Sequence, residues 1–271
     1  MRPYLIAVDL DGTLLGTDKR VSLRTQAALA AVAAAGHHVV AVTGRSRASA
    51  VALLAGTPAI ETIVGSNGAY AHRVATGLVD GSWPIRAAEA EAWIDSIRTH
   101  LPGASVGWES EGGIVYEPGF LALAGDPATI DFGESGTEPL AGALYKLFVR
   151  TPSVTARALQ CLVADLLAGA AEVSSSGAPF VEVTAAGVDK GAGLQRIARA
   201  LGVPMTRTIA FGDNLNDVPM FRVAGVAVAM GNAVPEVREL ADRIAPPNSA
   251  DGVAAMLEEM LAHGMRSGQS G

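Results

Sequence analysis

The chain has 271 residues, of which 49% are hydrophobic and 17% charged, and its formal net charge is −7. This length is close to the upper limit for one domain, so one large domain and two unequal domains are both open. The acidic balance provides no basic field for a polyanion, which excludes nucleic acid as an expected partner.

The first expected element is a buried strand, Leu5–Val8, which Asp9 ends at once. An apolar run this short is no hydrophobic region of a signal peptide. We therefore expect a cytoplasmic protein.

Residues 25–44 contain no Asp, Glu, Lys or Arg, and they approach the length of a membrane span, roughly 20 residues. Gly36 divides them, however, and the part before it is rich in alanine. We expect a helix capped by Ser22 and ended before Gly36, followed by the buried strand Val39–Val42. No membrane partner is expected.

Further apolar runs with no polar alternation follow along the chain, and helical segments lie between several of them. Runs of this kind are typical of strands buried on both faces of a parallel sheet. Strands that alternate with helices predict an α/β fold with a doubly wound, Rossmann-like parallel-sheet core. The further strands are expected at 63–64, 208–211 and 226–229, and the later helices at 189–201 and 252–262.

Residues 82–185 interrupt this pattern with mixed strands and helices that carry no chemical motif, which predicts an inserted α/β domain. The core domain then consists of residues 1–81 and 186–271. Expected elements of the insertion are a helix at 86–100, a hairpin at 105–116, strands at 144–149 and 180–183, and a helix at 154–167.

The single cysteine, Cys161, lies in the last of these helices and cannot form an internal disulfide. We expect it in the core, on the apolar face of its helix, in a reducing compartment. Residues 118–142 hold many Gly and Pro and are the part of the sequence in which elements are hardest to assign, and the polar tail 267–271 is expected to be disordered.

Each expected core strand is followed directly by a small or polar cluster. The carboxyl ends of parallel strands share one edge of a sheet, where ligands bind. The sequence therefore predicts one site assembled from distant segments. These clusters are Asp9–Thr13, Thr43–Arg45, Gly65–Gly68, Gly212–Asn214 and Gly231–Asn232.

Asp9 and Asp11 suit the two roles that phosphoryl transfer requires. A carboxylate such as Asp9 can attack phosphorus without a base, and water can cleave the resulting acyl phosphate. Asp11 could protonate the departing oxygen and then take a proton from the hydrolytic water. Gly12 permits close backbone approach to the phosphate.

Two more acids, Asp213 and Asp217, are expected near Asp9 and Asp11. Four carboxylates around a phosphate dianion repel one another strongly, and a hard divalent cation balances them. Oxygen ligands favour Mg²⁺. No cluster of Cys and His with zinc spacing is present in the sequence.

Other polar residues of the clusters are candidates for binding the phosphoryl group. Lys190 supplies a positive charge, while Thr43 and Asn216 can donate hydrogen bonds to phosphate. Arg45 suits either a substrate contact or a structural salt bridge, and Asn67 with Gly68 suits either a turn or the site.

Together these segments resemble the four motifs of the haloacid dehalogenase-like superfamily. The chain is similar over nearly its whole length to the Cof-type (IIB) hydrolases, which carry an α/β cap between the second and third motifs, where the inserted domain lies here. The residues that carry the resemblance are Asp9-Leu10-Asp11-Gly12-Thr13, Thr43-Gly44-Arg45, Lys190 and Gly212-Asp213-Asn214-Leu215-Asn216-Asp217.

The resemblance implies a role for each motif residue. Asp9 would be the nucleophile, and Asp11 the general acid and base. Mg²⁺ would be held by Asp9, by the backbone of Asp11 and by Asp213, with Asp217 supporting the metal shell. Phosphate and substrate contacts are implied for Thr43, Gly44, Arg45, Lys190 and Asn216.

The acid at position 11 separates branches of this superfamily, because the dehalogenases lack an acid there and the transport ATPases carry Thr. We therefore expect a Mg²⁺-dependent phosphatase for small phosphorylated metabolites, with sugar phosphates as the leading class. A sugar phosphomutase of the same superfamily and a non-catalytic metabolite-binding protein are the alternatives. The pattern favours no particular oligomeric state.

Overall fold

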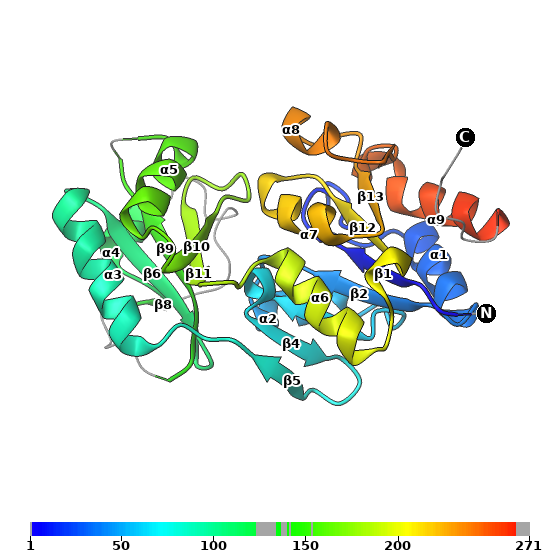
Figure 1. Ribbon diagram of the computed structural model, residues 1–271, viewed down its shortest axis with the longest axis horizontal. Helices are drawn as coiled ribbons and strands as arrows, with labels where there is room; N and C mark the ends of the chain where they lie inside the picture. Colours follow the sequence, from blue (N-terminus) through cyan, green and yellow to red (C-terminus); the bar gives the residue numbers. More distant parts are fainter. Residues whose placement is uncertain (1, 123–133, 137–139, 141, 153, 264–271) are drawn as a thin grey trace.

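The computed structural model describes residues 2–122, 134–136, 140, 142–152 and 154–263. The expectations for the tail 267–271 and for most of 118–142 lie outside these residues. The chain forms an α/β core with a mostly parallel sheet and an inserted cap with a mostly antiparallel sheet, as predicted (Figure 1). The division at residues 82 and 185 into separate folding units stays a prediction.

The core sheet has eight strands in the order β14-β13-β12-β1-β2-β3-β4-β5. Those from β14 to β3 pair in parallel, and β4 and β5 extend the sheet as antiparallel strands. All five expected core strands form. The strand bounds are β1 Leu5–Val8, β2 His38–Val42, β3 Thr62–Gly65, β4 Tyr70–Arg73, β5 Val79–Ser82, β12 Thr208–Gly212, β13 Val226–Ala229 and β14 Arg243–Ile244.

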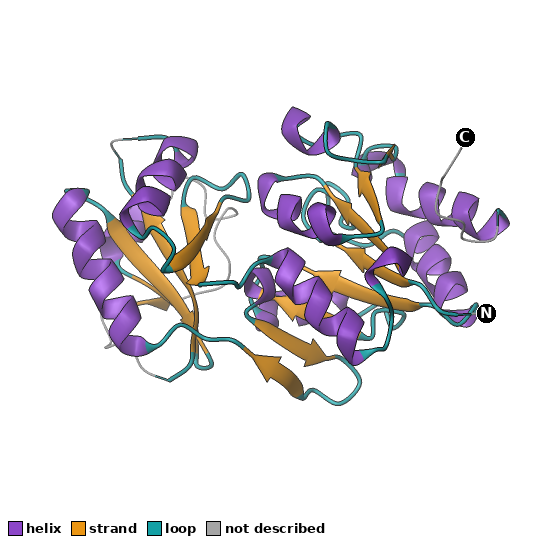
Figure 2. Ribbon diagram, in the orientation of Figure 1, coloured by secondary structure: helices purple, strands orange, loops and turns teal. Residues whose placement is uncertain are grey.

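Helices cover both faces of this sheet, which explains why its strands are continuously apolar (Figure 2). Successive side chains of a strand point to opposite faces. In β1, Ile6 and Val8 therefore pack with α1 and α9, while Leu5 and Ala7 pack with α6 and α7. The helices of the core are α1 Leu23–Ala34, α2 Arg47–Leu54, α6 Lys190–Ala200, α7 Val218–Val223, α8 Pro235–Arg238 and α9 Gly252–Ala262.

The predicted helix ends are confirmed by their capping contacts. Ser22 accepts a hydrogen bond from the Thr25 amide at the start of α1, and Gly36 follows the end of α1 with φ +82°. Asp189 caps α6 through the Ala192 amide. Among the described residues, no helix is both long enough and apolar enough to cross a membrane.

The cap sheet has the strand order β10-β11-β9-β6-β7-β8. Its two faces differ in character: Leu147 and Val149 of β9 pack with the helices, while Lys146 and Phe148 belong to the opposite face. The elements of the cap are α3 Ala87–His100, β6 Ser105–Ser110, β7 Gly113–Tyr116, α4 Pro118–Ala122, β8 Glu134–Ser135, β9 Leu144–Arg150, α5 Ala156–Leu166, β10 Ala171–Ser174 and β11 Val181–Ala185.

The expectation that Cys161 is a core residue is wrong, because its side chain is exposed. The buried residues of α5 are Leu159 and Val163, one turn apart on the same face. Cys161 lies midway between them in sequence, about 200° around the helix from each, so it points to solvent.

Candidate active site

The topology of the core sheet places Asp9 and Asp213 side by side. They follow the neighbouring parallel strands β1 and β12 at their carboxyl ends, in register at Val8 and Phe211. The chain adds β2 and β3 on one side of this pair and β13 and β14 on the other. Asp9 and Asp213 therefore lie at the switch point of the sheet, the usual place for a ligand in such folds.

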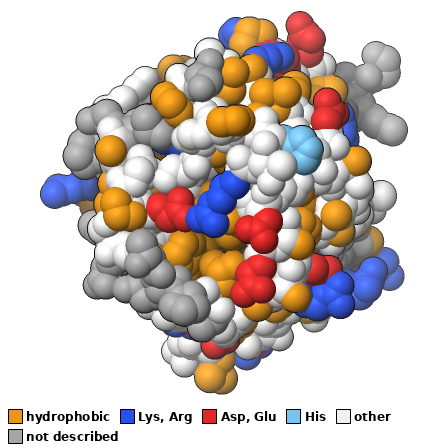
Figure 3. Space-filling model, turned by 90° about the vertical axis from the view of Figure 1, so that its left-hand side faces the viewer, with side chains coloured by type: hydrophobic (Ala, Val, Ile, Leu, Met, Phe, Trp, Pro, Cys, Tyr) orange, Lys and Arg blue, Asp and Glu red, His pale blue; other side chains and the backbone are white. Residues whose placement is uncertain are grey.

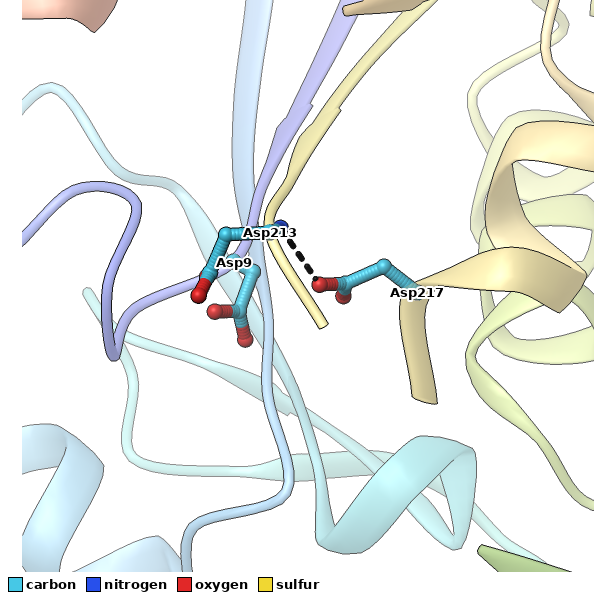
Figure 4. Close-up of side chains that lie close together, drawn as sticks. All are labelled: Asp9, Asp213 and Asp217. Atoms are coloured by element: carbon cyan, nitrogen blue, oxygen red, sulfur yellow. Dashed lines mark hydrogen bonds between the residues drawn. The ribbon is translucent and has the colours of Figure 1, made fainter. Parts of the chain in front are cut away.

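Asp217 joins these two acids from the turn that follows β12. One carboxylate oxygen from each of Asp9, Asp213 and Asp217 lies within 4.8 Å of the others. All three side chains are buried and lie close together in Figure 4. Three carboxylates this close form a donor set that suits a hard cation such as Mg²⁺.

The loop after Asp9 is shaped around Asp213. Thr13 Oγ1 donates a hydrogen bond of 2.8 Å to Asp213 Oδ1. Gly12 has φ +82°, and a Cβ at this position would lie 2.3 Å from Asp213 Oδ2. The residue at position 12 thus has no room for a side chain, because the Asp213 carboxylate occupies that space.

Lys190 joins two of the acids from the first turn of α6. Its Nζ atom is 2.6 Å from Asp9 Oδ1 and 2.6 Å from Asp217 Oδ1. The other oxygen of Asp217 accepts hydrogen bonds from the amides of Asp213 and Asn214, at 2.9 and 3.0 Å. Asp217 is therefore held in place by Lys190 and by the backbone of its own loop.

Burial and mutual repulsion shape the titration of this cluster. Burial raises the pKa of Asp213 to about 6, and Asp217 adds to the rise while Thr13 opposes it. Burial would lower the pKa of Lys190, but the carboxylates of Asp217 and Asp9 outweigh it and raise that pKa. Lys190 therefore stays charged, and the negative excess that remains is what a divalent cation would balance.

Asp11 has different partners from the other acids. Arg45 donates to it from Nε at 2.5 Å and from Nη2 at 2.8 Å, and Lys19 Nζ donates at 2.7 Å. Although burial alone would raise the pKa of Asp11, these two cations lower it. Asp11 thus faces the same cavity as Asp9 without joining the cluster of three acids, and it forms a salt bridge with Arg45.

A cavity of about 260 Å³ lies above these residues, between the core and the cap. Thr43 and Asn216 are almost fully buried in its wall. The predicted site residues that line it are Asp9, Asp11, Thr43, Gly44, Arg45 and Asn216. The cap contributes, among others, Lys146, Phe148, Phe180 and Glu182.

Several of these cavity residues were not predicted. Lys146 and Glu182 are charged residues within otherwise apolar strands of the cap, and this irregularity was the available signal. Lys19, in the turn after the first motif, has no such signal, since nothing in its neighbours separates it from a surface lysine.

Comparison with known proteins agrees with this geometry. The family model of the haloacid dehalogenase-like hydrolases matches residues 6–257. The chain is 31% identical to 5-amino-6-(5-phospho-D-ribitylamino)uracil phosphatase YitU of Bacillus subtilis strain 168, over 96% of this chain and 98% of that protein.

Solved structures share the fold. A haloacid dehalogenase-like hydrolase from Bacillus subtilis superposes with a TM-score of 0.82 at 23% identity, covering 95% of this chain and 99% of that one. A sugar phosphatase of subclass IIB superposes with a TM-score of 0.81 at 24% identity, covering 98% and 100%. This chain belongs to the haloacid dehalogenase-like hydrolases, as a phosphatase.

Proposed function

We propose that this phosphatase hydrolyses phosphomonoesters of small metabolites, sugar phosphates above all, through a phosphorylated Asp9 and with Mg²⁺ as cofactor. The observation that carries the proposal is the position of Asp9. Its carboxylate lies on the wall of the cavity, 2.6 Å from the Lys190 ammonium and within reach of Asp213. The candidate nucleophile thus faces the cavity, while a cation and a second carboxylate lie directly beside it.

The proposed reaction has two steps. An oxygen of Asp9 bonds to phosphorus as the ester bond breaks, and Asp11 gives its proton to the departing alkoxide. Asp11 then takes a proton from water, whose oxygen attacks phosphorus, releases inorganic phosphate and restores Asp9. Arg45 and Lys19 hold Asp11 as a carboxylate, so substrate must take over part of their contacts before Asp11 carries a proton.

The residues around Asp9 fit a cation on chemical grounds. Mg²⁺ would be held by the carboxylates of Asp9 and Asp213 and by the backbone of Asp11. When bound, the cation would balance the negative charge and polarise the phosphoryl oxygens. Lys190, Thr43 and Asn216 would hold the remaining phosphate oxygens.

A second candidate class of substrate is a phosphate ester whose leaving group carries both hydroxyl groups and a planar ring. Beside Lys146 and Glu182, which suit hydroxyl groups, the cap contributes Phe148 and Phe180. The related phosphatase from Bacillus subtilis acts on a ribityl phosphate that carries a uracil ring, as its name states. Ring-bearing polyol phosphates therefore belong in any substrate panel beside simple sugar phosphates.

The test is an assay of phosphate release from such a panel, with Mg²⁺ and with a chelator. Asp9→Asn should lose roughly four orders of magnitude in kcat, because an amide forms no acyl phosphate. Release of inorganic phosphate separates hydrolysis from a phosphomutase reaction. Full activity in metal-free buffer, or in a folded Asp9→Asn variant, would refute the proposal.

A further inference from the structure

The turn after β3 has an unusual backbone. Ser66 and Asn67 are both left-handed, with φ of 47° and 55°, and Gly68 follows with φ of 101°. Two consecutive non-glycine residues in this conformation carry strain, which persists where the surroundings hold the backbone. The reaction proposed above uses neither of their side chains.

The core holds this turn from both sides. The Asn67 amide donates to the carbonyl of Thr43 at 2.9 Å, which ties the turn to the predicted phosphate loop. On the other side, a Cβ at Gly68 would lie 2.2 Å from the carbonyl oxygen of Asp189, at the start of α6. The backbone is thus fixed between two motif segments of the active site.

The side chains of the turn point to the cap. Ser66 Oγ donates to Glu109 Oε2 at 2.6 Å, and Asn67 Nδ2 donates to Glu182 Oε2 at 3.2 Å. Both glutamates are almost fully buried, with exposed fractions of 3% and 4%. Buried carboxylates need such partners, because an unpaired one is costly.

Lys146 completes the contact from β9. It pairs with Glu182 at 2.7 Å and also donates to the carbonyl oxygen of Gly44. A Cβ at Gly44 would lie 3.0 Å from Asn67 Oδ1 and 3.5 Å from both carboxylate oxygens of Glu182. Because Gly44 has no side chain, Asn67 of the core and Glu182 of the cap can approach each other beside it.

We propose that Glu109, Lys146 and Glu182 form a cap latch, which grips the core at Ser66, Asn67 and Gly44. Its members are positioning residues: by holding Gly44 and Asn67 they fix the Thr43 loop, to which Asn67 is bonded. Asn216, which donates to Asn67 Oδ1 at 3.3 Å, is fixed in the same way. The latch closes the cap and orders the phosphate-binding residues in one step.

The energetics follow from the burial of the latch. Opening the cap separates each of the three charged groups from a core partner, so the closed state is favoured when all contacts form together. A phosphate group held by Thr43 and Asn216 would stabilise the same arrangement, and by reciprocity closure would tighten phosphate binding. This coupling rests on the proposed function, while the latch contacts themselves do not.

Two variants test the latch from opposite sides. Asn67→Gly removes the side-chain amide that binds Glu182 and keeps the backbone amide. It adds no backbone strain, since glycine accepts φ of 55°. Lys146→Met with Glu182→Gln removes a cation and an anion together, which avoids leaving one of this pair unpaired. The control is Arg98→Met, because Arg98 also forms an ion pair, but with Glu117 of the cap itself. The cap end in Figure 3 shows basic and acidic side chains lying next to one another.

Cap closure can be measured without any ligand. One spin label is attached to Cys161, which is exposed on α5 of the cap. The other is attached to a cysteine introduced by Ala30→Cys, an exposed position of helix α1 in the core. We expect one short distance in the parent and in Arg98→Met, and a second, longer distance in both latch variants. Circular dichroism checks that each variant is folded. Identical distance distributions in all four proteins would overturn the latch, whether or not the enzyme is a phosphatase.

Kinetics test the positioning role. We expect kcat/KM for a sugar phosphate to fall roughly tenfold to a hundredfold in Asn67→Gly, as lost hydrogen bonds to charged groups would cause. Asn67 is the variant to use here, because Lys146 and Glu182 line the substrate cavity and Asn67 does not. Arg98→Met should stay within about twofold of the parent, as is usual for exposed pairs. A longer spin-label distance together with an unchanged kcat/KM would refute the positioning role. Absence of phosphatase activity in the parent would refute the proposed function and leave the distance test standing.

Discussion

Gly12 and Gly36 have the same backbone angle, φ +82°, in different surroundings. A Cβ at Gly12 would overlap the Asp213 carboxylate, whereas one at Gly36 would meet no atom within 4 Å. Alanine adds the same conformational strain at both positions, about 1 kcal/mol. We predict that Gly12→Ala also displaces Asp213 and lowers kcat/KM about a hundredfold, because a small misplacement of a reacting group is costly.

The measurement is kcat/KM as a function of Mg²⁺ concentration for the two alanine variants. Gly36→Ala should match the parent in activity and lose a little thermal stability. Equal activity in Gly12→Ala and Gly36→Ala would show that the close packing of Gly12 against the Asp213 carboxylate has no part in catalysis.

Among the described residues, Lys190 is the cation that forms ion pairs with both Asp9 and Asp217. Removing it in Lys190→Met leaves these carboxylates buried without a cation, so the free energy of unfolding should fall by about 3–5 kcal/mol. The double variant Lys190→Met with Asp217→Asn removes opposite charges together and should recover part of this loss. Urea titration of the parent, Lys190→Met, Asp217→Asn and the double variant measures this recovery, and additive losses of the two single variants would contradict the assignment.

The positions of Asp9 and Asp213 were predictable because each acid follows a buried strand at the same edge of the sheet. They come together because β1 and β12 are neighbours. The apolar runs predicted the shared edge of the sheet, and the order of the strands along it comes from the structure. The partners of Lys146 were not predictable in this way. They depend on the register of β9 against β6 and β11, where Glu109 pairs opposite Lys146 and Glu182 opposite Phe148.

At the scale of elements, a histidine links the residue before β1 to the residue before β2. The amide of Tyr4 donates to His37 Nδ1 at 3.2 Å, so this nitrogen carries no proton. Burial, with Arg207 and His38 nearby, lowers the pKa of His37 below its usual 6.5. Protonation would place a hydrogen on the acceptor atom and break this contact.

The sign of the pH effect follows from this lowered pKa. Below pH about 6.5 the unfolded chain binds a proton at His37 that the folded protein does not. The free energy of unfolding therefore decreases as the pH is lowered, by at most about 1.4 kcal/mol per pH unit. Asn offers an acceptor oxygen and does not titrate, so His37→Asn should flatten urea midpoints between pH 7 and pH 5. His100→Asn, which removes an exposed histidine of the cap, is the control, and parallel curves for all three proteins would contradict the prediction.

The core strands with continuous apolar runs were predictable, whereas β4 was missed although three of its four residues are buried. The strands β1, β2, β12 and β13 are apolar runs because helices cover both faces of the sheet. The edge strands β5 and β14 were missed for the same reason. β5 is largely exposed and β14 has two residues, so neither needs an apolar sequence.

At the scale of the whole molecule, the cap is joined to the core by segments near residues 83–86 and 186–189 (Figure 1). Trp83 and Val188 belong to the core at these joints. The Arg196 guanidinium lies 4.2 Å from the centre of the Trp83 ring, and Val188 is 2% exposed. Ile85, in contrast, packs in the hydrophobic core of the cap. A cut that removes residues 85–186 therefore leaves the core sheet and its helices intact and removes packing from the small cluster around Tyr70 and Val188.

We predict that this core, closed by a short Gly/Ser linker, still binds Mg²⁺ and slowly cleaves p-nitrophenyl phosphate. Asp9, Asp213, Asp217 and Lys190 all belong to the part that remains, and their contacts with one another cross no cap residue. The core loses packing at Tyr70. Its ring centre lies 5.2 Å from that of Tyr145 in the cap, so Tyr70 would become exposed when the cap is removed.

Discrimination among metabolites should largely disappear in the same protein. The cap wall, with Lys146, Phe148 and Glu182, contacts the part of the substrate beyond the phosphate, and such remote contacts are used to lower the barrier. We expect kcat/KM for the preferred metabolite to fall roughly a thousandfold or more, and the values for different metabolites to converge. A folded core that ranked its substrates as the parent does would place specificity in the core loops around Arg45 and Asn67, because no cap residue would be left to choose between them.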